Sequence, residues 1–221
     1  METRKLNPSH DTALTIFVGA SSKATNWENK ETTWSDLLNR CANTTKTKET
    51  LVQYLQMDKA KQSKIKDVGG FVGGYFATNG RRKKEGLIGR TVVTLDADNV
   101  KKDSNIWEGF KATFSFAACI YSTHKHTEEA PRLRIIIPLA DSTNVEQYEA
   151  VARYIADKIG MEYFDPTTFQ ASKLMFWPST PKDIDFFFDW QDGEILDPEE
   201  ILKKYKDWKD VSSWPMHKSE T

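Results

Sequence analysis

The alternation of apolar and polar residues along the chain predicts a series of short strands. Residues 91–96, 114–121 and 132–139 have the continuous apolar centres that are typical of buried strands. The run 69–76 is apolar but rich in glycine, which favours a bulged strand or a close backbone approach. Residues 20–32 are polar and are expected to form a loop. The remaining expected strands are at 14–18, 173–177 and 184–188.

Apolar residues at helical spacing predict five helices between these strands. Thr33 and Asp36 have the spacing of a capping box at the start of the first helix, and Thr143 and Glu146 repeat it before the longest one. Gly160 is expected to end that longest helix. Helices interspersed among strands predict an α+β fold, with a mixed sheet covered by helices. The expected helices are at 34–41, 49–59, around 107–110, at 145–159 and from 197 onward.

The composition indicates a folded protein and excludes several classes. The 221 residues include 7 Trp, 7 Tyr and 12 Phe, far more than an intrinsically disordered chain carries. No apolar run reaches the roughly 20 residues that are needed to cross a bilayer, and the polar N-terminus lacks a signal-peptide core. Cys41 and Cys119 are the only cysteines, which excludes a disulfide framework and a zinc site of several cysteines. We therefore expect a soluble protein of a reducing cytoplasm.

The charges are unevenly distributed, although their sum is only −1. Residues 1–90 carry 16 basic and 9 acidic side chains, and residues 91–221 carry 15 basic and 23 acidic ones. This segregation is typical of a protein that binds a polyanion with one surface and a cation with another. The alternative is that the charged runs only face solvent and bind nothing. The basic half ends in Arg81, Arg82, Lys83, Lys84 and Arg90.

Carboxylates follow one of the buried strands. Asp96 and Asp98 are two residues apart, so on a strand their side chains leave the same face, with Cα atoms about 6.5–7 Å apart. Two carboxylates held this close repel each other unless a cation lies between them, and Mg²⁺ prefers such oxygen ligands. The alternative is a turn, where Asp-x-Asp is common. Asp165 precedes a proline and alone predicts a turn, but it is a candidate third ligand beside this pair.

Basic groups gather after the strand at 114–121 and at the start of the strand at 132–139. Because side chains alternate along a strand, Arg132 and Arg134 are expected on the same side. Cations this close together need an anion, and a triphosphate would supply it. The alternative is that Glu128 and Glu129 pair with them on the surface. The group comprises His124, Lys125, His126, Arg132 and Arg134.

Taken in order, these blocks resemble the motifs of the archaeo-eukaryotic primase superfamily: Asp-x-Asp on a strand, a Ser-x-His segment and a later strand-associated Asp. They are most similar to the primase-polymerase domain of phage and prophage primases of the virulence-associated protein E group. The resemblance covers about residues 14–210. The stretches that carry it are 65–72, 94–98, 121–127 with 131–134, and 164–179.

The resemblance implies a palm related to the RNA-recognition-motif fold, packed on an N-terminal α/β module, with the active site between them. One catalytic domain is expected over residues 1–210, and residues 211–221 are expected to be a tail or the start of a linker. Within the domain we expect a basic module at about 1–90, a palm at about 91–190 and a C-terminal helix at about 191–210.

The resemblance also implies roles for individual residues. Asp96, Asp98 and Asp165 would be the catalytic ligands of two divalent ions, Mg²⁺ or Mn²⁺. One histidine, His124 or His126, would contact the phosphates of the nucleotide, and we favour His126. The other expected phosphate contacts are Lys125, Arg132, Arg134, Ser172 and Lys173. The expected contacts with nucleic acid are Arg81, Arg82, Lys83, Lys84 and Arg90.

The implied activity is template-directed nucleotidyl transfer onto a 3′-hydroxyl, by a DNA primase or polymerase of phage or mobile-element replication in a bacterial cytoplasm. The implied partners are a single-stranded DNA template, a primer, an NTP or dNTP and a helicase, with no membrane partner. The chain itself has no G-x-x-x-x-G-K-[ST] phosphate loop and no cysteine set for a zinc element.

Two other classes remain as alternatives. The first is a replication-initiator endonuclease with a His-x-His metal motif, for which Lys125 is an unsuitable middle residue because that position should be buried. The second is a non-catalytic module in which aromatic residues such as Trp177 stack on the bases of single-stranded DNA.

Overall fold

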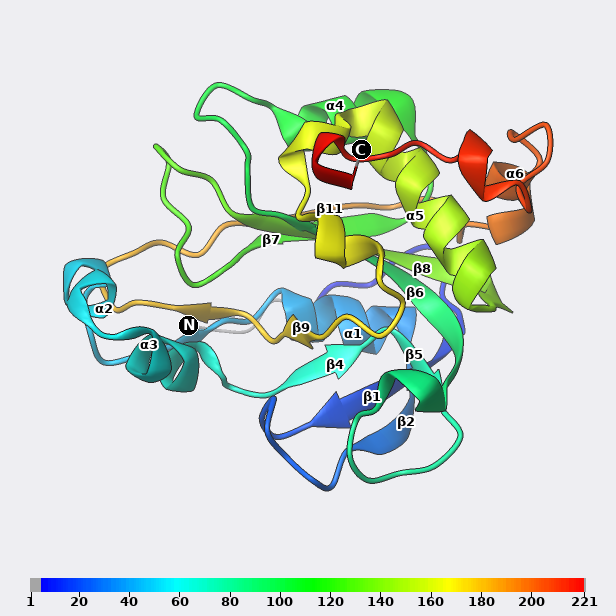
Figure 1. Cartoon of the computed structure of the whole chain (residues 1–221). Coiled ribbons are helices and arrows are strands. Elements are labelled where there is room, and N and C mark those ends of the chain that lie inside the picture. The colour runs from blue at the N-terminus through cyan, green and yellow to red at the C-terminus, as the bar shows by residue number, and fades with distance from the viewer. Residues whose placement is uncertain (1–4, 221) are drawn as a thin grey trace.

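The computed structural model describes residues 5–220, in which two antiparallel sheets pack against each other and helices lie on both faces of the larger one (Figure 1). The expected α+β fold class, with a mixed or antiparallel sheet, is confirmed. Residues 1–4 of the expected N-terminal module and Thr221 of the expected tail lie outside the described residues. No helix of the described part combines the length and apolar character that crossing a membrane requires.

The smaller sheet has four antiparallel strands in the order β2-β1-β4-β9. The expectation of a loop at 20–32 is wrong in its second half, because residues 28–33 form β2. This strand pairs with β1 along six residues, but it is an edge strand with both faces largely exposed, so its sequence carries no apolar alternation. The strands are β1 (Ala13–Gly19), β2 (Glu28–Thr33), β4 (Gly70–Val72) and β9 (Met175–Phe176).

The larger sheet has five antiparallel strands in the order β11-β7-β8-β6-β5. Its centre is buried on both faces: Ile135 and Ile137 of β8 face one core, and Ile136 faces the other. A separate parallel pair joins β3 (Thr45–Lys46) to β10 (Ser179–Thr180). The strands of the larger sheet are β5 (Gly74–Phe76), β6 (Leu87–Ala97), β7 (Ala118–Ser122), β8 (Leu133–Thr143) and β11 (Phe188–Gln191).

The glycine-rich run at 69–76 connects the two sheets instead of forming one strand. It divides at Gly73, so that β4 belongs to the smaller sheet and β5 to the larger one. A Cβ atom on Gly73 would lie 2.8 Å from the Cβ of Val92, and one on Gly74 would lie 2.1 Å from the carbonyl oxygen of Gly89. Glycine is therefore required where the chain crosses closely over β6.

The helices begin and end close to the expected positions, with two exceptions. The helix expected at 49–59 ends at Gln56, and a second helix follows from a cap at Asp58. This second helix buries no residue, so no apolar stripe marks it in the sequence. The capping box of the longest helix is formed by Asn144 and Gln147, one residue later than expected. The helices are α1 (Trp34–Cys41), α2 (Leu51–Gln56), α3 (Lys59–Lys66), α4 (Ile106–Thr113), α5 (Val145–Ile159) and α6 (Pro198–Leu202).

The larger sheet separates two cores. On one face, α4 and α5 contribute Trp107, Phe110 and Tyr148, and on the other face α1 contributes Trp34 and Leu37. The strand expected at 184–188 instead begins at Phe188, as β11 on the sheet edge. Short 3₁₀ turns lie at Lys84–Gly86, Met161–Tyr163, Pro166–Phe169, Val211–Ser213 and Lys218–Glu220.

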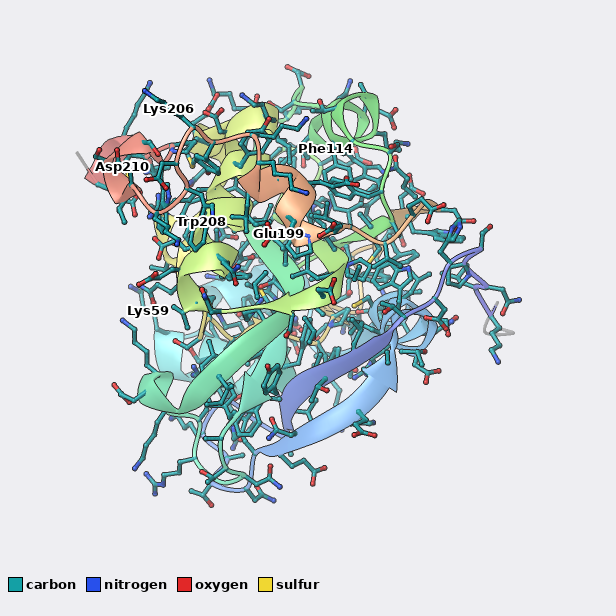
Figure 2. The ribbon with its side chains drawn as sticks, turned by 90° about the vertical axis from the view of Figure 1, so that its right-hand side faces the viewer. Lys59, Phe114, Glu199, Lys206, Trp208 and Asp210 are labelled. Atoms are coloured by element: carbon teal, nitrogen blue, oxygen red, sulfur yellow. The ribbon has the colours of Figure 1, made fainter. Side chains whose placement is uncertain are left out.

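The C-terminal segment lies along α5 (Figure 2). The indole of Trp214 is buried, and Arg153 of α5 forms an ion pair with Glu220 (2.8 Å). The region expected to be a tail or linker thus packs on the body of the protein within the described residues.

Candidate active site

A cavity of about 220 Å³ opens where β9 of the smaller sheet meets the ends of β6, β7 and β8. Its lining also includes the last residue of α3 and the segment that leads from α5 to β10. Five basic side chains and three carboxylates line it, together with one histidine. The charged groups are Lys66, Lys125, Arg132, Arg134, Lys173, Asp96, Asp98 and Asp165.

The backbone brings the three carboxylates together from two segments far apart in the sequence. Asp96 and Asp98 lie at the end of β6, as the sequence indicates. The Asp165 N–H donates to the Asp96 carbonyl oxygen (2.9 Å), and the Asp96 N–H donates to the hydroxyl of Thr168 (2.8 Å). One oxygen from each carboxylate lies within 4.8 Å of the others. Three hard oxygen donors at this separation are a suitable ligand set for a divalent ion.

Each carboxylate also forms an ion pair with a different cation of the cavity. The side chains of Asp96 and Arg134 are only 8% and 10% exposed, so this pair is buried. The other two pairs are more open, and Asp98 and Asp165 are 34% and 29% exposed. Arg132 and Lys173 are therefore freer to exchange partners than Arg134. The pairs are Asp96–Arg134 (3.0 Å), Asp98–Arg132 (3.1 Å) and Asp165–Lys173 (3.3 Å).

The carboxylates differ in how strongly the protein favours their charged form. Burial, followed by the charge of Asp96, raises the pKa of Asp98, and Arg132 offsets this only in part. Burial also opposes the charge of Asp165, but hydrogen bonds from Thr167 and the Lys173 ammonium outweigh it and lower the pKa. A cation between Asp96 and Asp98 would relieve the repulsion that raises the pKa of Asp98.

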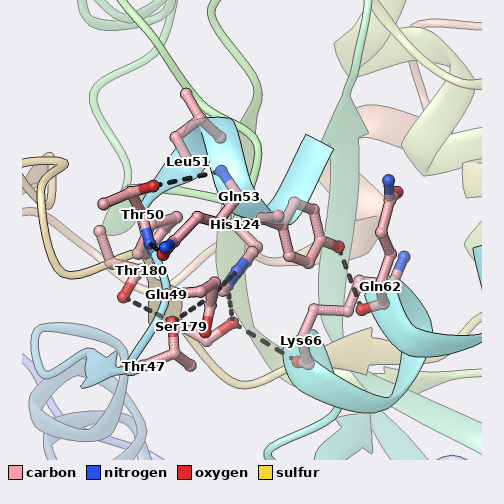
Figure 3. A network of polar contacts seen from close by, with 12 residues as sticks. Thr47, Glu49, Thr50, Leu51, Gln53, Gln62, Lys66, His124, Ser179 and Thr180 are labelled. Atoms are coloured by element: carbon pink, nitrogen blue, oxygen red, sulfur yellow. Dashed lines mark hydrogen bonds and ion pairs between the residues drawn. The ribbon is translucent and has the colours of Figure 1, made fainter. Parts of the chain in front are cut away.

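His124, rather than His126, lies in the cavity wall. Its Nδ1 lies 2.9 Å from the Ser179 hydroxyl and its Nε2 lies 3.1 Å from a Glu49 carboxylate oxygen (Figure 3). The ring of His126 instead packs on Phe187, its Nδ1 accepts the Arg132 N–H (3.1 Å), and it does not line the cavity. The histidine that we favoured, His126, thus lies outside the lining of this cavity, and His124 is part of it.

Burial makes His124 a poor base. It lowers the pKa of the imidazole, and the hydrogen bond with Glu49 offsets this only in part. Its Nε2 faces a Glu49 carboxylate oxygen, and its Nδ1 faces the Ser179 hydroxyl.

We expect the stability of the protein to fall as the pH is lowered through the ordinary histidine value of 6.5. Because the folded-state pKa is lowered, the unfolded chain binds a proton there that the folded chain does not. A His124→Gln variant should lose this contribution, so its free energy of unfolding should depend less on pH between 7.5 and about 5.5. Urea unfolding across this range measures the slope, with the exposed His10→Gln as the control. Equal slopes for His124→Gln and the wild type would contradict the assignment.

Arg90 is a structural residue and not a contact for nucleic acid, which corrects the expectation. It is fully buried in β6, and its guanidinium lies 4.1 Å from the ring centroid of Tyr148. It donates to the carbonyl oxygens of Val92 (2.8 Å) and Ala171 (2.6 Å) and to the Thr94 hydroxyl (2.9 Å). Arg90 thereby ties β6 to the segment that carries Asp165 and Lys173.

We expect Arg90→Met to lower the free energy of unfolding by about 1–3 kcal/mol, because several buried oxygens lose their donor. Arg81→Met, at an exposed position of the same basic half, should change it by less than about 0.5 kcal/mol. Urea denaturation of both variants measures the difference. An Arg90→Met variant as stable as the wild type would show that these hydrogen bonds contribute nothing.

The other members of the basic run divide into exposed and packed residues. Arg81, Lys83 and Lys84 are exposed. Arg82 is half-buried, lies over the ring of Trp27 and donates to the carbonyl oxygen of Ser172 (3.0 Å). Ser172, an expected phosphate contact, does not line the cavity, whereas Lys173 does. Arg82 thus joins the run to Ser172, the neighbour of Lys173 in the sequence.

An aromatic side chain separates the cavity from a second one. Trp177 lines both the first cavity and another of about 610 Å³ beside β1, β2 and α1. Its ring stacks on Phe71 at 4.5 Å, and the guanidinium of Arg40 lies 4.9 Å from its centroid. The indole is partly buried, and Phe71 and Arg40 both contact its ring, so it forms part of the wall of both cavities.

Sequence reasoning missed two residues of the site. Lys66 ends α3, a helix with no apolar pattern, and Glu49 precedes α2 as an ordinary polar residue. Lys66 lies inside the stretch 65–72 that carries the family resemblance, which is the one signal that marks it. Glu49 has no such signal, because its pairing with His124 joins positions 75 residues apart.

These observations define an α+β protein whose two antiparallel sheets enclose a three-carboxylate centre within a basic cavity. The chain belongs to the VapE N-terminal domain family, whose model matches residues 1–217. The resemblance to the virulence-associated protein E group is thereby confirmed.

Among solved structures, the chain is similar to the AEP domain of the primase-polymerase (PrimPol) of cyanophage S-2L. The TM-score is 0.46 at 11% sequence identity, and the alignment covers 87% of this chain and 88% of that one. No curated protein matches the chain.

Proposed function

We propose that the protein is a template-directed nucleotidyltransferase, a DNA primase or polymerase that extends a 3′-hydroxyl on a single-stranded template. The observation that carries this proposal is the approach of Asp96, Asp98 and Asp165 to within 4.8 Å inside a cavity whose other charges are positive. Carboxylates that bind metal, facing cations that bind phosphate, are the groups that phosphoryl transfer requires. The family match and the resemblance of the motifs support the same activity.

The residues present fit divalent metal ions. All three ligands are hard carboxylate oxygens, which suit Mg²⁺ and Mn²⁺. Burial and the charge of Asp96 raise the pKa of Asp98, and a bound cation would oppose both effects. Two such ions, when bound, would lower the pKa of the attacking hydroxyl and stabilise charge on the leaving pyrophosphate.

The side chains of the protein have separate tasks in this proposal. Arg134 holds the Asp96 carboxylate in place through a buried ion pair. Arg132 and Lys173 are more exposed, so they can leave Asp98 and Asp165 and bind the phosphates of the substrate. His124 holds Ser179 and Glu49 together in the wall of the cavity through two hydrogen bonds.

We further propose that the template binds near the exposed residues of the basic run, Arg81, Lys83 and Lys84. Arg82 joins this run to Ser172, and the next residue, Lys173, lines the cavity. Binding through such residues releases counterions and weakens as the salt concentration rises. A helicase remains the partner implied by the family resemblance.

The geometry disfavours the endonuclease alternative. That activity requires both histidines of the His-x-His motif at one metal site, but only His124 lines the cavity. Its two ring nitrogens are already engaged by Ser179 and Glu49.

A primer-extension assay tests the proposal. Labelled NTPs and dNTPs are offered with primed and unprimed single-stranded DNA, in the presence of Mg²⁺, Mn²⁺ or a chelator. We expect incorporation that follows the template sequence and stops when the metal is chelated. A covalent adduct between DNA and a tyrosine, or DNA binding without incorporation under any condition, would contradict it.

A further inference from the structure

The 3₁₀ turn Pro166–Phe169 follows the third carboxylate of the site and contacts both β6 and α5. Asp165 is the residue that caps this turn. The hydroxyl of Thr168 attaches the turn to β6, because it donates to the carbonyl oxygen of Thr94 (3.2 Å) and accepts the Asp96 N–H (2.8 Å). The position of Asp165 relative to Asp96 therefore depends on how firmly this turn is held.

An arginine of α5 packs on the last residue of the turn. The guanidinium of Arg153 lies 4.5 Å from the ring centroid of Phe169, and both side chains are buried. A cation over an aromatic ring is attracted to it more strongly when the two are out of contact with water. The turn is therefore attached to β6 through Thr168 and to α5 through Arg153.

The C-terminal segment in turn holds Arg153. Its Nη1 and Nη2 donate to the two carboxylate oxygens of Glu220 (2.9 and 2.8 Å), and Nη1 also donates to the carbonyl oxygen of Pro215 (3.2 Å). Its Nε donates to Glu149, four residues earlier in α5 (3.0 Å). A bidentate pair with a carboxylate fixes the plane of a guanidinium as well as its position. Glu220 thus helps to set the orientation in which Arg153 lies over Phe169.

The segment that carries Glu220 is itself anchored on the body of the protein (Figure 2). The indole of Trp214 is buried in the core on the α5 side of the larger sheet, and its N–H donates to the carbonyl oxygen of Trp208 (2.7 Å). The Tyr205 hydroxyl donates to the carbonyl oxygen of Ala150 in α5 (2.7 Å). A continuous series of contacts therefore joins the C-terminal segment, α5, the 3₁₀ turn and the three-carboxylate centre.

We propose that Arg153 is a positioning residue of the three-carboxylate centre and that the C-terminal segment, through Glu220, keeps it in place. This inference rests on the proposed function, because it treats Asp165 as a metal ligand. Arg153 does not line the cavity, so it acts through Phe169 and the turn. Residues behind a metal ligand orient it, and their loss weakens metal binding although they do not touch the metal.

Mn²⁺ binding, measured by electron paramagnetic resonance of the free ion, tests the inference without any reaction. Loss of a residue that contacts a metal ligand typically weakens binding about 10–100-fold, and Arg153 lies one layer further out, so Arg153→Met should weaken it about five- to tenfold. Glu220→Ala should weaken it about threefold, because Glu149 still holds the guanidinium.

Tyr205→Phe is the matched control. It removes one hydrogen bond between the C-terminal region and α5 but leaves the hydrogen bonds of Arg153 intact. It should therefore bind Mn²⁺ as the wild type does. The side chain of Glu220 is 24% exposed, so Glu220→Ala keeps the test decisive even if Arg153→Met does not fold.

A double variant shows whether Arg153 acts through Asp165. Asp165→Asn has already lost the third ligand, so the addition of Arg153→Met should weaken Mn²⁺ binding no further. A general loosening of the fold would instead add to the effect of Asp165→Asn. In primer extension, Arg153→Met should raise the Mn²⁺ concentration for half-maximal incorporation more than it lowers the maximal rate.

The outcomes separate this inference from the proposed function. The inference is refuted if Arg153→Met and Glu220→Ala bind Mn²⁺ as the wild type does, or if Tyr205→Phe loses as much affinity as they do. It is also refuted if the losses from Arg153→Met and Asp165→Asn add. In each of these cases, primer extension by the wild type would still support the function. If the Mn²⁺ affinity depends on Arg153 as described but the wild type never incorporates nucleotides, the inference stands and the proposed function fails.

Discussion

An Asp98→Asn variant should lose nucleotide incorporation by more than about 100-fold while it keeps its fold and its affinity for single-stranded DNA. Replacing even an outer-shell partner of a metal ligand typically costs about 10–100-fold, so loss of a direct ligand should cost more. Asp98 is the cleanest position for this test because its side chain is 34% exposed and the amide has nearly the same shape. Incorporation on a primed template and DNA affinity by fluorescence anisotropy measure the two effects.

Asp141→Asn is the matched control, since Asp141 is an exposed carboxylate on β8 outside the cavity. It should incorporate nucleotides at the rate of the wild type. Asp96 is less suitable, because its removal also leaves the buried Arg134 without its partner. Incorporation by Asp98→Asn at the rate of the wild type would remove Asp98 from the proposed machinery.

Replacement of Arg134 by methionine should cause the largest loss of stability, about 3–5 kcal/mol of the free energy of unfolding. The Arg134–Asp96 pair is buried at 3.0 Å, and removing the guanidinium leaves Asp96 as an uncompensated buried charge. The carbonyl oxygen of Phe176, which accepts from Arg134 at 2.9 Å, also loses this donor. Urea denaturation measures the loss.

Two further variants show whether the buried charge is the cause. Arg132→Met breaks a pair whose side chains are 37% and 34% exposed, and it should cost no more than about 1 kcal/mol. The double variant Arg134→Met with Asp96→Ala should be more stable than Arg134→Met alone, because no charge remains buried without a partner. Equal losses for Arg132→Met and Arg134→Met would indicate that burial of the pair has no energetic consequence.

Part of the site followed from the sequence alone. The apolar runs of β6 and β8 are long enough to predict both strands from the sequence. In the structure, the antiparallel register of these strands places Asp96 directly opposite Arg134. The nearness of Asp165 could not be derived in this way. It depends on a backbone hydrogen bond between residues 69 positions apart, and the sequence indicates Asp165 only as a candidate third ligand, whose role the family resemblance then implies.

The other differences between the expected and the observed structure arise from tertiary contacts that local sequence does not show. The strand β2 is polar because it lies at an edge, and α3 shows no apolar stripe because it buries no residue. Arg90 belongs to a basic half of the chain, yet it is buried, and its donors are satisfied partly by the distant residues Ala171 and Tyr148. Local sequence does not show that these two residues approach Arg90, so it could not distinguish a buried arginine from one that binds DNA.

The central claim is that Asp96, Asp98 and Asp165 together hold divalent metal. Crystals of the protein soaked in Mn²⁺, with diffraction recorded at the manganese absorption edge, test it most directly. The account predicts anomalous density between these three carboxylates and its loss from crystals of the Asp98→Asn variant. Density found only at other acidic groups of the surface, with none between these three side chains, would contradict the account.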